Sequence, residues 1–384
     1  MTPAPLRRSP WPIFVSVALL AGATAAGIAA LSLADALTAT GLPDPGPATT
    51  LGLPFVRACG EIAAAAAVGG LLFAAFFVPP QDNGVLDTGG YRALRLAGVA
   101  SGIWAVCAAL LVPLTISDVS GNPLREHLNP VEIWRVSAAV DTASAWRWTA
   151  LLALVVTVAS RSVLRWSWTP VLFTGALLTL VPLALTGHSA AGGSHDLATN
   201  SLLIHLVAGA LWSGGLLALL AHGMQNGDHT DLAARRFSAV ALWCFIAMLI
   251  SGIINALVRI APGELFSTSY GALVVAKALA LAVLGAIGWR QRRSAVAALR
   301  RDPQARAPLV RLATVEALVF GVTFGIAVGL GRTPPPPPAV WNPSAAEAAL
   351  GYDFAGPPTA ARILLDWRFD LLFGSAAIVF AAVY

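Results

Sequence analysis

The sequence has 384 residues, of which 57% are hydrophobic and only 11% are charged. A soluble globular domain carries roughly 25% charged residues, so the composition excludes that class. The net charge of +5 comes from arginines between apolar runs, and no aromatic-and-basic patch of the kind that binds nucleic acid is present. The apolar runs are about 20 residues long, which suits helices crossing a hydrocarbon core, whereas a membrane barrel would show short alternating segments.

We therefore predict an all-α protein, a polytopic transmembrane helical bundle with about nine complete spans and a partial tenth. Most arginines fall in segments on the same side of the membrane as the N-terminus, which predicts a cytoplasmic N-terminus. The chain would end inside its last span. The expected spans are 12–34, 51–78, 93–116, 146–161, 168–187, 198–221, 237–260, 271–290, 309–331 and 369–384.

Three connections between these spans have distinctive compositions. The outer segment 117–145 contains Glu-Ile-Trp-Arg-Val at 132–136, which predicts a helix lying in the membrane interface. The inner segment 291–308 is basic and rich in alanine, which predicts a cytoplasmic helix or linker. The outer segment 332–368 includes five consecutive prolines, which favour an extended polyproline spacer and thus a boundary between domains.

The tetrapeptide Gly-Gly-Leu-Leu occurs twice, at residues 69–72 and 214–217. Both copies fall in spans that would cross the membrane in the same direction. Either an internal duplication or the close packing of helices at small residues explains the repeat.

Polar pairs interrupt two of the apolar spans. Arg57 and Glu61 are four residues apart, so they share one helix face and can pair. Ser251 and Asn255 have the same spacing in a later span. Ionisable groups inside a membrane cost roughly 2.5–3.5 kcal/mol each by insertion measurements, so each such position requires a structural or functional reason.

His205 and Lys277 interrupt two further spans. At a rise of about 1.5 Å per residue, these two side chains come to a similar depth in the outer half of the membrane as Arg57 and Asn255. Glu316 lies nearer the inner side and is not expected to join them directly. The pattern favours a site or pathway that opens to the outside, or else a buried polar network that locks the bundle together.

Histidines cluster at one outer connection. His188 ends the fifth span, His195 lies in the following loop, and that loop leads into the helix of His205. Imidazole is a frequent ligand of transition metals, so the three residues could capture a copper ion. His188 and His195 could equally be ordinary loop residues. His222 and His229 are expected on the inner side, in contact with water.

Soft ligands for Cu(I) are scarce, because the chain has only three methionines and three cysteines. Cys244 and Met248 are four residues apart on one face of the seventh span. They could form a soft step for a copper ion, although a stripe of ordinary core residues explains them better.

One stretch and the block that follows it carry a family resemblance. The stretch His-Leu-Val-Ala-Gly-Ala-Leu-Trp-Ser-Gly-Gly-Leu at 205–216 resembles the histidine helix of CopD-type copper-resistance membrane proteins. The resemblance covers roughly 140–330, fits the first three helices more loosely, and implies copper handling or transport by a multi-pass protein of the plasma membrane. The matching positions downstream are Arg236-Phe237-Ser238, Ile250-Ser251-Gly252, Tyr270-Gly271 and Lys277.

A second resemblance concerns the tail. Asp-Trp-Arg-Phe-Asp at 366–370 looks like the start of a CtaG-type cytochrome oxidase assembly domain, which actinobacterial proteins fuse behind a CopD-type domain. Only its first helix would be present, so no CtaG function is assigned. The resemblance implies that copper could supply cytochrome c oxidase assembly, with a respiratory oxidase or a periplasmic copper chaperone as partner.

These inferences give a domain division and a set of site residues. The expected domains are an N-terminal three-helix segment at 1–118, a CopD-like membrane domain at 119–331, a Pro-rich extracytoplasmic linker at 332–368 and a truncated CtaG-like helix at 369–384. The expected copper ligands are His188, His195 and His205, and the residues expected to line the route or set its electrostatic field are Ser251, Asn255, Arg57, Glu61 and Lys277.

Two other functions remain open from the sequence. One is a non-transporting assembly scaffold for a respiratory oxidase, and the other is an electron-transfer protein that binds haem b between two histidines on facing helices. An enzyme is not expected, because no span or loop shows a nucleophile beside a base. No P-loop is present either, so transport would be passive or coupled to a gradient.

Overall fold

The computed structural model describes residues 9–41, 43–186, 195–302 and 305–336, together with residues 345 and 359. Within these ranges the chain is almost wholly helical and contains no β-strand beyond one isolated bridge between Val85 and Arg165. The α-helices are α1 Trp11–Leu31, α2 Leu33–Thr40, α3 Pro47–Thr50, α4 Gly52–Leu72, α5 Thr88–Ser120, α6 Pro130–Ser137, α7 Asp141–Ser162, α8 Thr169–Leu178, α9 Val181–Ala184, α10 His195–Met224, α11 Thr230–Arg259, α12 Ser269–Arg293, α13 Ala295–Arg301 and α14 Ala307–Leu330.

Nine helical stretches in the described part of the chain are long and apolar enough to cross a membrane. Each overlaps a predicted complete span, so the predicted fold class is confirmed. The predicted tenth span at 369–384 lies outside the described residues. The nine are Trp11–Leu31, Pro47–Phe77, Thr88–Ser120, Asp141–Ser162, Trp166–Ala184, Asn200–Met224, Thr230–Leu257, Ser269–Leu299 and Ala307–Leu330.

Short polar side chains mark where several helices begin. Asp87 accepts a hydrogen bond from the Gly90 backbone N–H at 2.6 Å and caps α5, and Thr268 accepts from Gly271 at 3.0 Å and caps α12. These bonds satisfy backbone donors that have no partner inside the helix. α5 ends at Gly121, whose φ of 68° is the left-handed conformation that glycine adopts without strain.

The predicted helices in the connections are also present. The segment 132–136 lies within α6 Pro130–Ser137, and the basic stretch after residue 290 forms the end of α12 and then α13. The proposed domain boundary at residue 118 stays a prediction. Residues from both sides of that boundary belong to one buried hydrophobic cluster, because α1 and α4 pack against α14 and α10.

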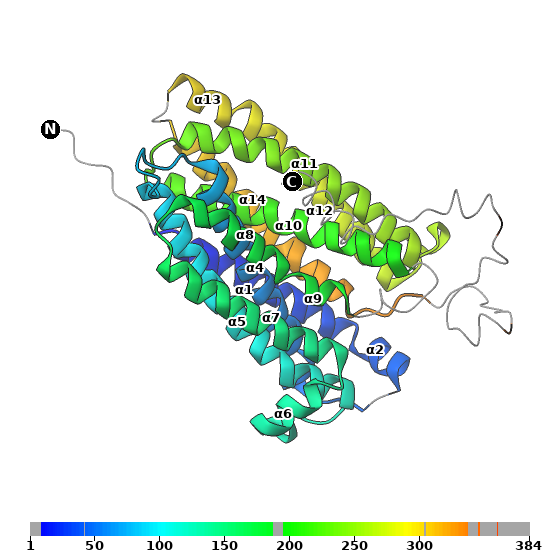
Figure 1. Cartoon of the computed structure of the whole chain (residues 1–384). Coiled ribbons are helices and arrows are strands. Elements are labelled where there is room, and N and C mark those ends of the chain that lie inside the picture. The colour runs from blue at the N-terminus through cyan, green and yellow to red at the C-terminus, as the bar shows by residue number, and fades with distance from the viewer. Residues whose placement is uncertain are drawn as a thin grey trace.

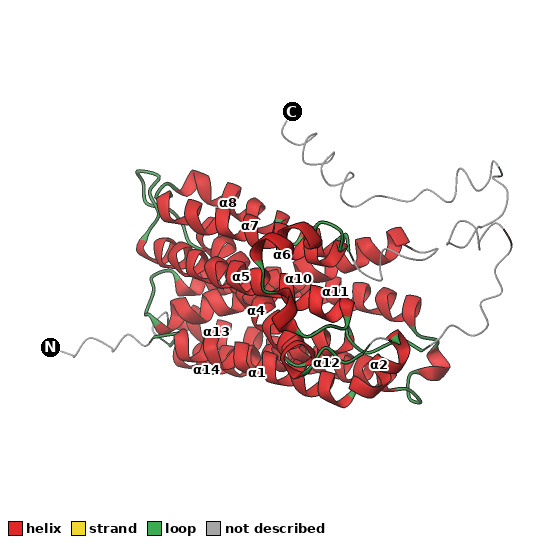
Figure 2. Ribbon diagram, turned by 90° about the horizontal axis from the view of Figure 1, so that it is seen from below, coloured by secondary structure: helices red, strands yellow, loops and turns green. Residues whose placement is uncertain are grey.

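The helices run roughly along one direction, with α4 in the middle of the bundle (Figure 1). In the apolar window of the α4 span, 89% of the residues are buried, compared with 17% for α11 and 11% for α12. α4 is therefore the central helix, and α11 and α12 present most of their surface outward. α13 and the start of α1 lie at one end of the bundle, here called the basic end, and α2 lies at the other end (Figures 1 and 2).

α4 and α10 cross in direct backbone contact at the repeated Gly-Gly pairs. A Cβ atom added to Gly69 would overlap the backbone of Gly214, and one added to Gly214 would overlap the carbonyl oxygen of Ala65. Small residues allow helices in a membrane to approach this closely. The repeat at 69–72 and 214–217 is thus accounted for by close packing, without a need for duplication.

α1 and α14 meet along a second seam of small residues. Gly321, Gly325 and Gly329 recur every four residues on one face of α14, and a Cβ at each would press on α1. The nearest α1 atom to a Cβ at Gly321 would be the Val17 carbonyl oxygen, at 2.8 Å. This seam joins the first span to the last described one, and it closes the bundle.

We expect Gly214→Ala to destabilise the protein by about 3 kcal/mol or more, because neither backbone can move away from the added methyl group. Gly27→Ala is the matched control, since a Cβ at Gly27 meets nothing within 4 Å. Thermal unfolding of the detergent-purified variants measures the difference. Equal melting temperatures for the two variants would contradict the close crossing of α4 and α10.

Candidate functional site

Four of the polar side chains inside the spans form one hydrogen-bonded cluster between α10 and α11. His205 Nδ1 lies 2.9 Å from the Ser251 hydroxyl. Ser201 donates to the Ser251 carbonyl oxygen at 3.1 Å, and the Asn255 amide donates both to Ser201 and to that same carbonyl oxygen. The end of the bundle that carries this cluster is here called the histidine end. The structure therefore brings together His205 and Asn255, which the sequence predicted at a similar depth, and Ser251, which lies one turn from Asn255.

The hydrogen bonds of Ser251 orient the imidazole of His205. The Ser251 hydroxyl lies 3.4 Å from the Met248 carbonyl oxygen, to which it can only donate. When it does so, it accepts from His205 Nδ1–H, and Nε2 keeps its lone pair. A ring held through one nitrogen in this way is prepared to bind a metal through the other.

Asn255 leaves one polar atom of the cluster without a partner. Its Oδ1 atom is buried and has no hydrogen bond within the described structure. A buried carbonyl oxygen without a donor is destabilising by about 1–3 kcal/mol, so a ligand or a water at this point would be stabilising.

Charged side chains surround the cluster on other helices. Arg57 Nε pairs with Glu61 Oε1 at 3.1 Å on α4, as the four-residue spacing predicted. Glu61 lies within electrostatic range of Lys277 on α12, and Lys277 and Arg259 both act on His205. The cations oppose the entry of another cation, and Glu61 offsets part of that effect.

The sequence analysis missed Ser201 and Arg259. Ser201 is only 3% exposed and bridges Asn255 to α10, and Arg259 also hydrogen-bonds to the buried Tyr270. Ser201 lies four residues before His205, a helical spacing that could have pointed to it. Arg259 is the last residue of α11, and its contact with Tyr270 of α12 joins two helices, so no local pattern indicates it.

The proposed copper triad is described only in part. His188 lies in the segment 187–194, outside the described residues, and His195 begins α10 without a described side chain. Among the residues whose side chains are described, no group of three or more His, Cys, Asp or Glu comes close enough to hold a metal ion. His188, His195 and His205 therefore remain a predicted ligand set.

The two soft side chains of α11 line the interior next to His205. Met248 Sδ would lie 3.8 Å from a Cβ at Gly209, one turn along α10 from His205. Cys244 is 5% exposed and belongs to the main hydrophobic cluster. Their position suits ordinary core packing. It also suits a pair of sulfur ligands that a copper ion would meet after leaving the polar cluster.

Glu316 lies apart from the cluster, as predicted, but it contacts the same helix as His205. Its carboxylate is fully buried, and Oε1 accepts a hydrogen bond from Trp212 Nε1 at 3.2 Å. The Trp212 ring also makes edge contacts with Phe245 and Phe320. The pairing of Glu316 with Trp212 depends on the packing of α14 against α10, and no local pattern indicates it.

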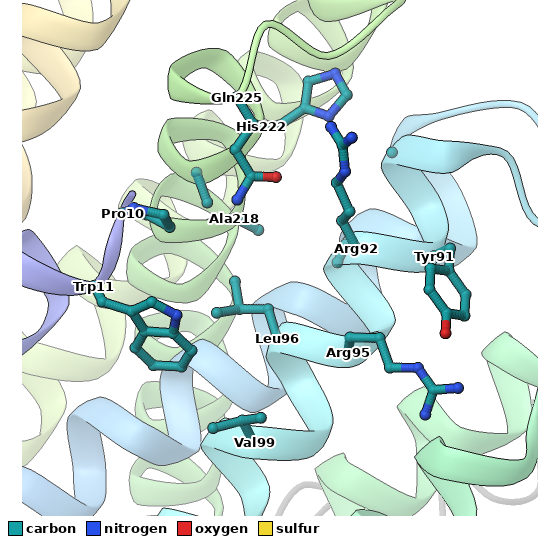
Figure 3. Close-up of a pocket in the computed structure, with 13 residues that line it drawn as sticks. Pro10, Trp11, Tyr91, Arg92, Arg95, Leu96, Val99, Ala218, His222 and Gln225 are labelled. Carbon is teal, nitrogen blue, oxygen red and sulfur yellow. The ribbon is translucent and has the colours of Figure 1, made fainter. Parts of the chain in front are cut away.

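A pocket of about 230 Å³ lies at the basic end, between the start of α1, α5 and the end of α10. In Figure 3 the Arg92 side chain extends toward His222 and Gln225, whereas Arg95 turns away from them. Trp11 and other apolar side chains line the rest of the pocket. The cations Arg92 and Arg95 line the pocket beside its one imidazole, His222, so a copper ion would meet positive charge there.

The expectation that His222 is in contact with water is wrong. Its ring is only 6% exposed, because the turn after α10 folds back so that His222 Nε2 and the Asp228 carbonyl oxygen lie 2.8 Å apart. The ring also packs on Phe73, with the ring centroids 4.8 Å apart. His229, in contrast, is exposed as predicted.

Comparison with known proteins agrees with this helical membrane architecture. Residues 48–197 match the model of the copper resistance protein D-like N-terminal domain, and residues 231–330 match the model of copper resistance protein D. The protein is thus a multi-pass helical membrane protein. It belongs to the copper resistance protein D family.

Relatives in other bacteria extend this assignment. The uncharacterized protein MT0111 of Mycobacterium tuberculosis is 28% identical over 346 residues, which are 90% of this chain and 50% of that protein. Inner membrane protein YebZ of Escherichia coli is 27% identical over 56% of this chain and 76% of its own length. Copper transport protein CutJ of Bacillus subtilis is 31% identical over 43% of this chain and 32% of its own length.

The chain spans about half the length of the mycobacterial relatives that it matches. No solved structure matches it. The protein is located in the plasma membrane. This follows from the nine helices in the described part that can span a membrane, from the family, and from the relative that is an inner membrane protein.

We expect Ser251→Ala to destabilise the protein by about 1–3 kcal/mol, because it leaves His205 Nδ1 without its partner in a partly buried position within a membrane span. Ser16→Ala is the control, since Ser16 only bonds back to the Pro12 carbonyl oxygen on the surface of α1. Thermal unfolding in detergent measures both variants. An unchanged melting temperature for Ser251→Ala would contradict the role of this hydroxyl in joining α10 to α11.

Proposed function

We propose that the protein binds copper at the histidine end of the bundle and passes it into or across the plasma membrane. One observation carries the proposal: His205 is held through Nδ1 by Ser251 within a membrane span, so Nε2 is available to a metal. The family and the copper transport protein of Bacillus subtilis support copper as the substrate.

In this proposal the ion is captured by His188, His195 and His205 around one mouth of the bundle. Ser251 and Asn255 then line the first part of the route, where the unpartnered Asn255 Oδ1 supplies a neutral oxygen. Met248 and Cys244 follow on the same helix and are the softer ligands that Cu(I) prefers.

The charged residues around His205 would control the entry of copper into the bundle. Lys277 and Arg259 act on His205, so they raise the electrostatic free energy of a metal ion bound to it. Glu61, which pairs with Arg57 and interacts with Lys277, offsets that effect. We propose that Arg57 and Lys277 are gatekeepers or pair partners, and that the protein acts as a transporter and not as an enzyme.

Downstream use of the copper is also a proposal. The sequence resemblance of the tail supports supply to cytochrome c oxidase assembly, with an oxidase subunit or a periplasmic copper chaperone as partner. Transport without an ATPase motif would follow an existing gradient.

For the haem-binding alternative, His205 and His222 do not form a pair of axial ligands. His205 and His222 lie on the same helix, 17 residues apart in the numbering, which corresponds to about 26 Å along its axis. One haem needs its two axial ligands from facing sides of the ring plane at a single depth, so these two cannot serve together.

We expect His205→Ala to weaken copper binding at least about tenfold, because it removes the only described imidazole in the cluster. His229→Asn is the control: His229 is an exposed histidine in the left-handed conformation, which asparagine tolerates. Copper content of detergent-purified protein after loading and desalting, determined by mass spectrometry, measures the effect.

Two outcomes would contradict the proposal. One is that the native protein retains no copper under loading conditions, and the other is that His205→Ala and His229→Asn retain as much copper as the native protein. Copurification of oxidase subunits in the absence of any bound copper would instead favour the assembly scaffold.

A further inference from the structure

A second cavity lies beside α10, about two helical turns from the polar cluster toward the basic end. Its volume is about 470 Å³, and it is enclosed by α10, α11, α12, α13 and α14. Pockets of 300–1,000 Å³ commonly hold small organic ligands, and one water molecule takes up only about 30 Å³. The cavity is therefore large enough for an aromatic ring with substituents.

The walls of this cavity are mainly apolar and aromatic. Trp212 and Phe245 stand edge to face at its inner wall, with ring centroids 5.9 Å apart, and Phe237 and Trp289 also line it. Flat aromatic walls of this kind suit a flat ring, because offset and edge contacts between rings stabilise such a complex by about 0.5–1.5 kcal/mol beyond the buried area.

Two buried polar atoms in the lining have no partner in the described structure. One is Glu316 Oε2, on a side chain that is 0% exposed, and the other is Gln291 Nε2, on a side chain that is 5% exposed. Glu316 uses its other oxygen to accept from Trp212. Each unpartnered buried group is destabilising by about 1–3 kcal/mol. A ligand that donates one hydrogen bond to Glu316 and accepts one from Gln291 would remove this cost.

The two atoms lie on neighbouring helices that line one cavity. Glu316 belongs to α14 and Gln291 to α12, and these two helices pack against each other. A Cβ at Gly288 would lie 3.9 Å from Glu316 Oε1, which places Glu316 beside α12 about one turn before Gln291. An acceptor and a donor in one cavity can each pair with a polar group of the same ring.

The cavity can be entered from the lipid, between α11 and α12. α11 and α12 are the helices with the least buried apolar windows, and the cavity lining includes their exposed residues Leu242, Ala286 and Trp289. α11 packs mainly on α10 and α12 mainly on α14, so the two helices contact each other little. A membrane-dissolved molecule can enter between them.

From these contacts we infer that the cavity binds the headgroup of a lipid-soluble quinol. One ring hydroxyl donates to Glu316 Oε2, and another oxygen on the ring accepts from Gln291 Nε2, while the ring packs against Trp212 and Phe245. A lipid acyl chain would fill the volume but leave both polar atoms unpaired. Water would pair them but would lie against apolar walls.

This site is independent of the proposed copper route. It lies about two turns further along the same face of α10 and uses none of the predicted copper ligands. Because Trp212 follows His205 by two turns of the same helix, the quinol would give the protein a second, membrane-borne ligand close to its candidate metal site.

The test uses metal-free, full-length protein in lipid nanodiscs, with decylubiquinol as the probe under anaerobic conditions. Binding is measured by equilibrium dialysis and corrected for partition into empty nanodiscs. We expect saturable binding, with at least about tenfold weaker affinity in Glu316→Gln and in Gln291→Leu, because each removes one hydrogen bond to a buried group. Ala241→Phe fills the cavity and should abolish binding.

Glu132→Gln on the surface helix α6 is the control for a lost carboxylate, and it should bind the probe as the native protein does. Each variant is first shown to be monodisperse with an unchanged melting transition. Non-saturable uptake that scales with the amount of lipid would overturn the inference, and so would saturable binding that is equal in native, Glu316→Gln, Gln291→Leu and Ala241→Phe protein. His205→Ala should bind the quinol normally, which separates this result from the copper proposal.

Discussion

The close crossing of α4 and α10 is the contact on which the rest of the bundle depends. At Gly69 and Gly214 the two backbones touch, and no residue with a Cβ fits at either position. In a membrane the lipid is as apolar as the helices, so their association relies on such tight packing and on polar contacts, since water is not there to drive it. The crossing fixes the rotation of α10, and with it the face on which His205 and Trp212 both lie.

Position along α10 separates the polar groups of this face into two sets, because residues seven apart lie two turns apart on the same side of a helix. His205 faces α11, where its Nδ1 atom hydrogen-bonds to Ser251 and Asn255 hydrogen-bonds to the Ser251 carbonyl oxygen. Trp212, seven residues later, turns toward α14 and pairs with the buried Glu316. A single helix therefore serves a polar cluster at one end of the bundle and an apolar cavity deeper inside it.

The two regions differ in how completely their hydrogen bonds are satisfied. The polar cluster has one unpartnered oxygen in the described structure, on Asn255, next to an oriented imidazole, which suits a cation or a water. The cavity has an acceptor and a donor, on Glu316 and Gln291, within aromatic walls. Because unpaired polar atoms in a low-dielectric interior are destabilising, both sets indicate ligands, but of different chemistry.

The sequence by itself determined the class of fold and the nine spans of the described part of the chain, because apolar run length is a local property. It also determined the pairing of Arg57 with Glu61, since residues four apart on a helix must be neighbours. Only the tertiary structure decided that His222 is buried and that Glu316 meets Trp212. Those contacts depend on the rotation and mutual packing of helices far apart in the chain, which periodicity in an apolar membrane span does not encode because every face of the helix is hydrophobic.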